Sequence, residues 1–190
     1  MRHPSSIRHK ALFIVLFLVA FTTRIIKLGP NFELVTTVMI LSSYYLGKKQ
    51  SLFLVFLILF VTDLILGNTN IFLFTWSGFL IPTFLISGVL KKIKLNKILV
   101  GTGLGISTNI FFYFWTNFGV WLLDSWGMYP KTLAGLLICF INGLPFLKNQ
   151  FISSLIFIPL GYFAGNLYLK IYPRLGKIFL NLASKIGQII

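Results

Sequence analysis

The chain has 190 residues, of which 57% are hydrophobic and only 11% are charged, and its mean hydropathy is +0.90. A soluble domain carries roughly 25% charged residues, so these values exclude one and indicate an integral membrane protein. The formal charge is +14, but the basic residues fall in short clusters between long apolar runs, which favours membrane topology over nucleic-acid binding. Because only three acidic residues and two histidines occur, most hydrolase, kinase and metalloenzyme chemistry lacks its side chains. We expect neither an enzyme nor a bound metal or cofactor.

Seven apolar blocks follow one another along the chain. They cover residues 11 to 28, 34 to 47, 51 to 66, 71 to 90, 98 to 122, 131 to 147 and 151 to 169. A chain in hydrocarbon has to satisfy its own backbone hydrogen bonds, and no strand-like alternation occurs, so the blocks are predicted to be helices. A signal peptide is the alternative for the first block, because Arg2, Arg8 and Lys10 precede it. It has no clear small-residue cleavage site, however, and is predicted to remain as the first helix.

The positions of Lys and Arg predict how the blocks cross the membrane, since cytoplasmic loops carry the excess. If residues 131 to 147 form a short re-entrant or interfacial helix, six helices span and both termini are cytoplasmic. Thirteen of the 17 basic residues then lie inside. The sequence therefore predicts an all-α polytopic protein with one transmembrane domain over residues 1–170 and a cytoplasmic tail over residues 171–190. The tail has the periodicity of an amphipathic helix lying on the anionic leaflet, and a frayed terminus is the alternative.

Asp63 is the most informative acidic residue. It lies in an apolar stretch, where a charge is costly unless it faces a cavity or a partner. Arg24, expected on the same outer rim, is its predicted partner. A purely structural ion pair is therefore the alternative to a functional site. Asn31 and Glu33, which follow the first block, are expected at the same outer mouth.

One helical face carries the clearest polar constellation. Asn109, Tyr113, Asn117 and Trp121 are spaced by four residues, so they follow one face of the fifth block. Amides beside aromatic rings are typical of a small-molecule pocket. The alternative is that the amides make interhelical hydrogen bonds and that the aromatic residues belong to the interfacial belt.

Two pairs of glycines have the G-x-x-x-G spacing that predicts close helix contacts. They are Gly101 with Gly105 and Gly161 with Gly165.

Five short motifs then occur in a fixed order. They read GPNFELV at 29–35, TD at 62–63 with LG at 66–67, TNFGVW at 116–121, YPKT at 129–132 with GL at 135–136 and Cys139, and LPF at 144–146. The set resembles an uncharacterised family of small bacterial integral membrane proteins. That family is regarded as similar to the substrate-specificity subunits, or S components, of energy-coupling-factor transporters.

This resemblance implies a six-helix subunit in the bacterial cytoplasmic membrane. Such a subunit captures a vitamin-like molecule or a metal ion outside, then joins a coupling membrane protein and two ATPases. The first helix lacks the Ala-x-x-x-Ala patch that S components often use for docking, so docking would need another small-residue face, such as Gly161 and Gly165.

We hypothesise an outward-facing pocket for a small nutrient, with a slight preference for a neutral or cationic ligand. Its lining is expected to include Asn31, Glu33, Asp63, Asn109, Tyr113, Asn117 and Trp121. A non-transporting scaffold that organises other membrane proteins is the alternative function. An intramembrane enzyme is disfavoured because no nucleophile and base form a convincing pair.

Overall fold

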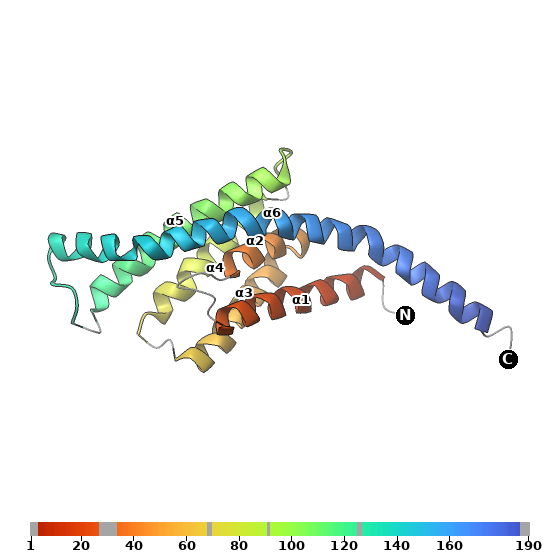
Figure 1. Cartoon of the computed structure of the whole chain (residues 1–190), viewed down its shortest axis with the longest axis horizontal. Helices are drawn as coiled ribbons and strands as arrows, with labels where there is room; N and C mark the ends of the chain where they lie inside the picture. The colour runs from red at the N-terminus through yellow and green to blue at the C-terminus, as the bar shows by residue number, and fades with distance from the viewer. Residues whose placement is uncertain (1–3, 27–33, 68–69, 91, 125–126, 187–190) are drawn as a thin grey trace.

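The computed structural model describes residues 4–26, 34–67, 70–90, 92–124 and 127–186, with side chains described between residues 8 and 171 of these ranges. All regular structure in them is α-helical (Figure 1). The helices are α1 (Pro4–Ile26), α2 (Val35–Tyr45), α3 (Lys48–Leu66), α4 (Phe72–Val89), α5 (Lys97–Leu123) and α6 (Leu133–Ile186). The prediction of an all-α chain is confirmed.

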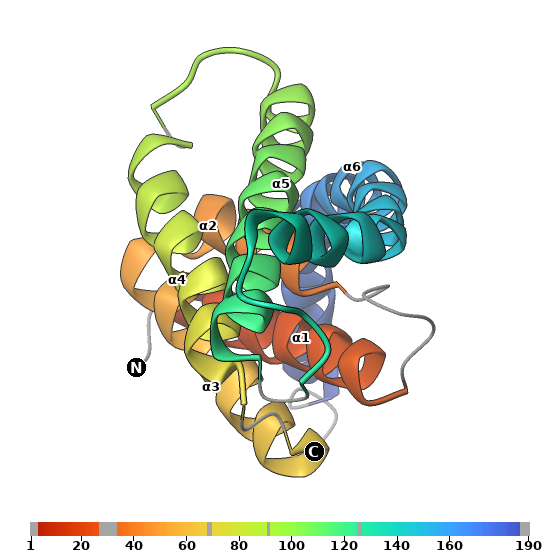
Figure 2. The same ribbon diagram turned by 90° about the vertical axis from the view of Figure 1, so that its left-hand side faces the viewer.

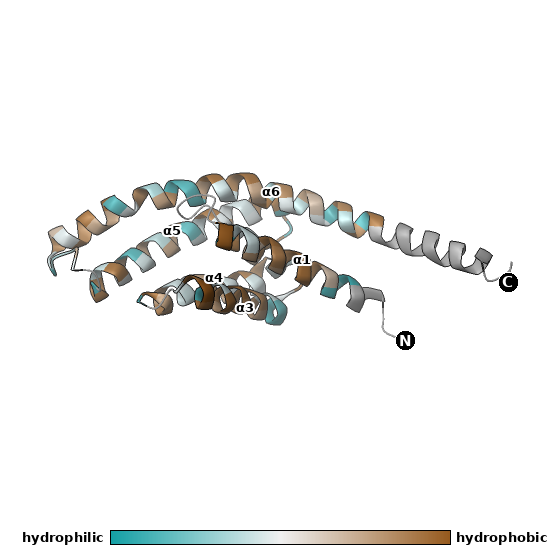
Figure 3. Cartoon of the chain, turned by 60° about the horizontal axis from the view of Figure 1, so that its bottom comes forward, coloured by the Kyte–Doolittle hydropathy of each residue, from teal (hydrophilic) through white to brown (hydrophobic). Residues whose placement is uncertain are grey.

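Five helices of the described chain are long and apolar enough to cross a membrane. These segments are Arg8–Ile26, Lys48–Leu66, Phe72–Val89, Lys97–Leu123 and Leu133–Ile171. Hydrophobic residues lie on the outer surfaces of the helices as well as between them (Figure 3). A surface of this kind suits contact with lipid.

The short helix α2 departs from the prediction of six full-length spans. It has 11 residues, about 16 Å at 1.5 Å per residue, against a hydrocarbon core of about 30 Å. Every residue from 35 to 43 is buried, and α2 contacts all five other helices. The block is apolar on all sides because protein surrounds it, and hydropathy alone does not distinguish burial in protein from burial in lipid.

The predicted break between residues 147 and 151 is also absent. Residues 131 to 147 do not form a separate short helix, because α6 continues unbroken from Leu133 to Ile186 as a bowed helix along the whole molecule (Figure 1). Gly135 and Gly143 serve close contacts instead of ending the helix. A Cβ atom on Gly135 would lie 2.1 Å from the Pro130 carbonyl oxygen, and one on Gly143 would lie 2.5 Å from the Asn117 amide oxygen.

Successive helices run in opposite directions. Side-chain hydrogen bonds join the end of each helix, or the residues beside it, to the start of the next: Thr23 with Leu34, Ser43 with Ser51, Asp63 with Trp76, Leu90 with Lys97, and Trp121 with Pro130. We call the end of the bundle at which α1, α3 and α5 finish the distal end. The opposite end, at which α1 begins and toward which α6 runs, is called the terminal end. Figure 2 looks at the distal end and shows α5 flanked by α4 and α6.

The two glycine pairs lie at helix interfaces, as predicted. Gly101 and Gly105 face Tyr162 and Ile158 of α6, while Gly161 faces Leu41 of α2. Gly165 likewise faces Tyr45 of α2. Docking through Gly161 and Gly165 stays a prediction, and in the structure α2 packs against both glycines.

Gly101 and Gly103 offer a matched test of this packing. A Cβ atom on Gly101 would lie 2.6 Å from the buried ring of Tyr162, whereas one on Gly103 would meet nothing within 4 Å. We expect Gly101→Ala to lower the free energy of unfolding by about 1–3 kcal/mol relative to Gly103→Ala, since overpacking costs that much. Unfolding of both variants in detergent measures the difference, and equal stabilities would contradict the close contact.

Candidate small-molecule site

A cavity of about 290 Å³ lies in the distal half of the bundle. Four helices and the residue before α4 line it: Arg24 from α1, Ile71 and Thr75, then Phe112, Tyr113, Thr116, Asn117 and Val120 from α5, and Phe146, Leu147 and Gln150 from α6. Its wall mixes aromatic and aliphatic surface with one guanidinium, two amides and two threonine hydroxyls. This mixture is typical of small-molecule sites, and the volume is near the lower limit of their range.

Two of the predicted site residues, Tyr113 and Asn117, line this cavity. The Tyr113 hydroxyl donates to the Phe140 carbonyl oxygen at 2.6 Å, which ties α5 to α6. The Asn117 amide nitrogen donates to the Tyr113 carbonyl oxygen at 2.8 Å. The amide oxygen of Asn117 lies against Gly143 and 3.9 Å from Cys139 Sγ. The Tyr113 ring and the Asn117 amide therefore line the cavity with orientations fixed by the bundle.

Gln150 is a lining residue that the sequence did not single out. It is 5% exposed, and its backbone carbonyl oxygen accepts from Asn109. Within the described part of the chain, its side-chain amide makes no hydrogen bond. Gln150 therefore offers a donor and an acceptor to whatever occupies the cavity. It was missed because the polar run of residues 148 to 150 was interpreted as a boundary between two helices.

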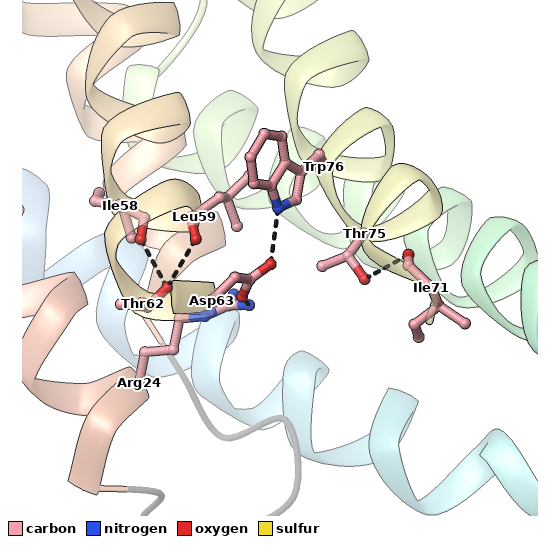
Figure 4. A network of polar contacts seen from close by, with 8 residues as sticks. All are labelled: Arg24, Ile58, Leu59, Thr62, Asp63, Ile71, Thr75 and Trp76. Atoms are coloured by element: carbon pink, nitrogen blue, oxygen red, sulfur yellow. Dashed lines mark hydrogen bonds and ion pairs between the residues drawn. The ribbon is translucent and has the colours of Figure 1, made fainter. Parts of the chain in front are cut away.

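An ion pair holds the only cationic group of the described cavity wall (Figure 4). Arg24 Nη2 lies 2.7 Å from Asp63 Oδ1, with both side chains buried, so the predicted pairing of these residues is confirmed. The Trp76 indole nitrogen donates to Asp63 Oδ2, also at 2.7 Å. Asp63 itself does not line the cavity; it joins α1, α3 and α4 and fixes the guanidinium that does.

Asn109 is fully buried and sealed by hydrogen bonds. Its amide oxygen accepts from Thr36 Oγ1 at 3.0 Å. Its amide nitrogen donates to the Gln150 carbonyl oxygen at 3.0 Å and to Ser154 Oγ at 2.8 Å. This residue locks α2, α5 and α6 together, which is the alternative that the sequence left open, and it lies next to the cavity without lining it.

Trp121 lies at the distal end of α5, away from the cavity wall. Its indole nitrogen donates to the Pro130 carbonyl oxygen at 3.0 Å, and Lys131 Nζ lies 5.6 Å from the centre of its ring. Lys131 also donates to the carbonyl oxygens of Trp121 and Leu122. Trp121 therefore anchors the connection between α5 and α6. The other two predicted site residues, Asn31 and Glu33, lie outside the described residues.

Among the described residues, no group of three His, Cys, Asp or Glu side chains is placed to hold a metal ion. The chain thus has the features of a multi-pass α-helical membrane protein with a mixed polar and apolar cavity. It belongs to the family of unknown function DUF6580, whose model matches residues 5–175. No curated protein and no solved structure matches the chain.

Asp63→Asn tests how much the buried ion pair contributes to stability. The substitution keeps the shape and an acceptor for Trp76 but leaves the Arg24 charge buried, so we expect the free energy of unfolding to fall by about 3 kcal/mol. Asp124→Asn is the matched control, because Asp124 accepts only backbone N–H groups among the described contacts and has a left-handed backbone that Asn tolerates. We expect it to change stability by about 0.5 kcal/mol or less.

The double variant Arg24→Gln with Asp63→Asn separates charge from shape. It removes both charges, so we expect part of the lost stability to return. Chemical denaturation in detergent measures all four proteins. A double variant no more stable than Asp63→Asn alone would show that the ion pair is not the source of the loss.

Proposed function

We propose that this protein is a substrate-binding integral membrane subunit that captures a small molecule in the distal cavity for import by partner subunits. The observation that carries the proposal is the cavity wall, where Arg24, Asn117 and Gln150 line one space beside aromatic rings. Polar groups inside a membrane helix bundle are costly, and those open to a cavity are commonly functional. Gln150 supports this reading most directly, because its side-chain amide makes no hydrogen bond within the described part of the chain.

The proposed topology places both termini in the cytoplasm and the cavity toward the outside. The alternating helix directions support it, because six helices joined by five reversals bring the chain back to the end at which it began, although α2 is too short to span by itself. The positive-inside rule supplies the orientation. Described lysines gather at the terminal end, at the start of α3 and around the connection between α4 and α5: Lys48, Lys49, Lys92, Lys94 and Lys97.

The proposed ligand is a neutral polar molecule that presents a hydrogen-bond acceptor to Arg24. The sequence had favoured a neutral or cationic ligand, because acidic residues were expected at the mouth. In the described cavity wall, however, the charged group is Arg24, and Asp63 lies behind it as its counter-ion. A cation would meet the guanidinium first, whereas an acceptor oxygen would gain a charge-assisted hydrogen bond.

The proposed partners follow from the resemblance to S components. They are a coupling membrane protein and ATPase subunits, which would supply the energy for release. Docking through the first helix remains possible sterically, because Ile14 and Leu18 of α1 are exposed on its outer face. In this proposal a large apolar face replaces the small-residue patch.

Two threonines of α5 offer a matched test of ligand binding. The hydroxyls of Thr116 and Thr108 both donate to the carbonyl oxygen four residues earlier, at 2.7 and 2.9 Å, but only Thr116 lines the cavity. We expect Thr116→Val to reduce the small molecule retained by purified protein about fivefold, the effect of losing one hydrogen bond of about 1 kcal/mol. Thr108→Val should leave retention unchanged.

Gln150→Met extends this test to the Gln150 side-chain amide, which makes no hydrogen bond in the described part of the chain. It keeps the length of the side chain and removes both polar atoms, so we expect near-complete loss of the co-purifying molecule with little change in unfolding temperature. Mass spectrometry of protein in mild detergent measures retention. The scaffold alternative predicts the reverse: no molecule is retained by the unaltered protein, and Thr116→Val and Gln150→Met lower its stability. Either result would contradict a binding subunit.

Single cysteines test the topology in a Cys139→Ala background, since the native thiol is buried. Met128→Cys, in the exposed connection between α5 and α6, should react with a membrane-impermeant maleimide on intact cells. Lys94→Cys, in the connection between α4 and α5, should react only after permeabilisation. The opposite labelling pattern would place the cavity on the cytoplasmic side and contradict import from outside.

A further inference from the structure

A second cavity, of about 410 Å³, forms a groove along the side of the bundle. It lies between α1, α2 and α6, and its wall is almost entirely apolar. Leu34, just before α2, lines it together with one face of α2: Thr37, Val38, Leu41 and Tyr45. In Figure 1, α2 lies between α1 and α6, and both of these helices contact α2. The floor of the groove is therefore α2, and α1 and α6 form its rims.

The floor of this groove contains a polar atom without a partner. Thr37 is 4% exposed and lines the groove. Its hydroxyl makes no hydrogen bond within the described structure, although most buried hydroxyls do. An occupant of the groove therefore lies against a mostly apolar surface whose α2 floor contains one unpartnered hydroxyl.

At the terminal end, an open polar site of about 410 Å³ lies next to the groove. Tyr45 lines both spaces, and Tyr44, Lys97 and Asn166 complete most of the polar wall. The Tyr45 hydroxyl donates to Asn166 Oδ1 at 3.0 Å. Lys97 donates to the Leu90 carbonyl oxygen at 3.4 Å and to the carbonyl oxygen of Ile93, and an ammonium has three donors. The apolar groove and the site with Lys97 thus border the same tyrosine, Tyr45.

The size of the groove excludes a helix as its occupant. One 5.4 Å turn of a helix 10 Å wide displaces about 420 Å³, so a single turn would already fill the groove. A partner helix could lie only across the rims. A flexible hydrocarbon chain is narrow enough to lie within it, and the charge of Lys97 suits an anionic group at its end.

We propose that this groove binds an anionic phospholipid of the surrounding membrane, with one acyl chain along α2 and the phosphate beside Lys97. Entry of the chain from the bilayer brings no hydrophobic gain, because lipid tails are as apolar as the groove. Selectivity therefore comes from the headgroup, and the site prefers an anionic lipid over a zwitterionic one. This site is separate from the distal cavity and does not depend on the function proposed for it.

The test compares phosphatidylglycerol with phosphatidylcholine of the same acyl chains, added to the full-length protein in detergent and counted by native mass spectrometry. We expect one phosphatidylglycerol retained per chain, with a preference over phosphatidylcholine of about fivefold or more, the effect of about 1 kcal/mol for one lysine. Lys97→Gln should remove this preference and Lys97→Arg should keep it. The matched control is Lys94→Gln, an exposed lysine at the same end that lines neither space.

Ala164→Phe tests the groove itself. Ala164 lines the groove and is exposed, so a larger side chain fills the groove without entering the core. We expect retention of both lipids to fall about tenfold. Equal retention of the two lipids by the unaltered protein, an equal effect of Lys94→Gln and Lys97→Gln, or unchanged retention by Ala164→Phe would each overturn the proposal. So would displacement of the lipid by glycerol phosphate alone, which would show that the headgroup binds without the chain.

Discussion

The bundle is governed by the need of each polar group inside it to find a partner, because neither lipid nor an apolar interior supplies one. Three buried serines illustrate the usual solution: Ser43, Ser51 and Ser87 bond one another at 2.8 to 3.4 Å and hold α2, α3 and α4 together at the terminal end. Asn109 does the same for α2, α5 and α6. Against this background, the amide of Gln150 and the hydroxyl of Thr37 stand out, because each faces a cavity.

The position of α2 explains where the distal cavity lies. Ser43, near the end of α2, is level with the start of α3 and the end of α4, so α2 occupies the terminal half of the bundle. Thr36, near its start, reaches only to Asn109 of α5. The cavity begins one turn further along α5, at Phe112, and no described residue of α2 lines it. A central helix of half the usual length therefore leaves room in the distal half, and the cavity lies there, lined by four of the five neighbours of α2.

Hydropathy and helix spacing predicted most of the architecture, but not the short length of α2 or the continuity of α6. The long apolar blocks became helices, and Asp63 found Arg24, because a buried charge has few possible partners. The length of α2 was overestimated, since its buried residues have the same composition as a lipid-facing span. In α6, two glycines and a polar run predicted a break that does not occur. Gly143 and Gly135 instead allow Asn117 and Pro130 to pack closely against the helix, and Gln150 lines the cavity. Whether a polar residue seals an interface or lines a cavity depends on tertiary contacts, which spacing does not contain: Asn109 and Asn117 lie on one face of one helix and differ in this respect.

The distal cavity and the groove beside α2 differ in polarity because different kinds of side chain line them. The polar groups that line the cavity are held in place by hydrogen bonds to neighbouring groups. Arg24 is held by Asp63, Asn117 by the Tyr113 carbonyl oxygen, and Thr116 by the Phe112 carbonyl oxygen. Alongside α2, the groove opens between α1 and α6, and most of its lining is side chains of the kind that also face lipid. Groups held in place by neighbours lose little further freedom when a ligand binds, so the distal cavity is suited to selective recognition of a small polar molecule. The lining of the groove has a few hydroxyls and no charge of its own, and its selectivity has to come from the cationic site beside it.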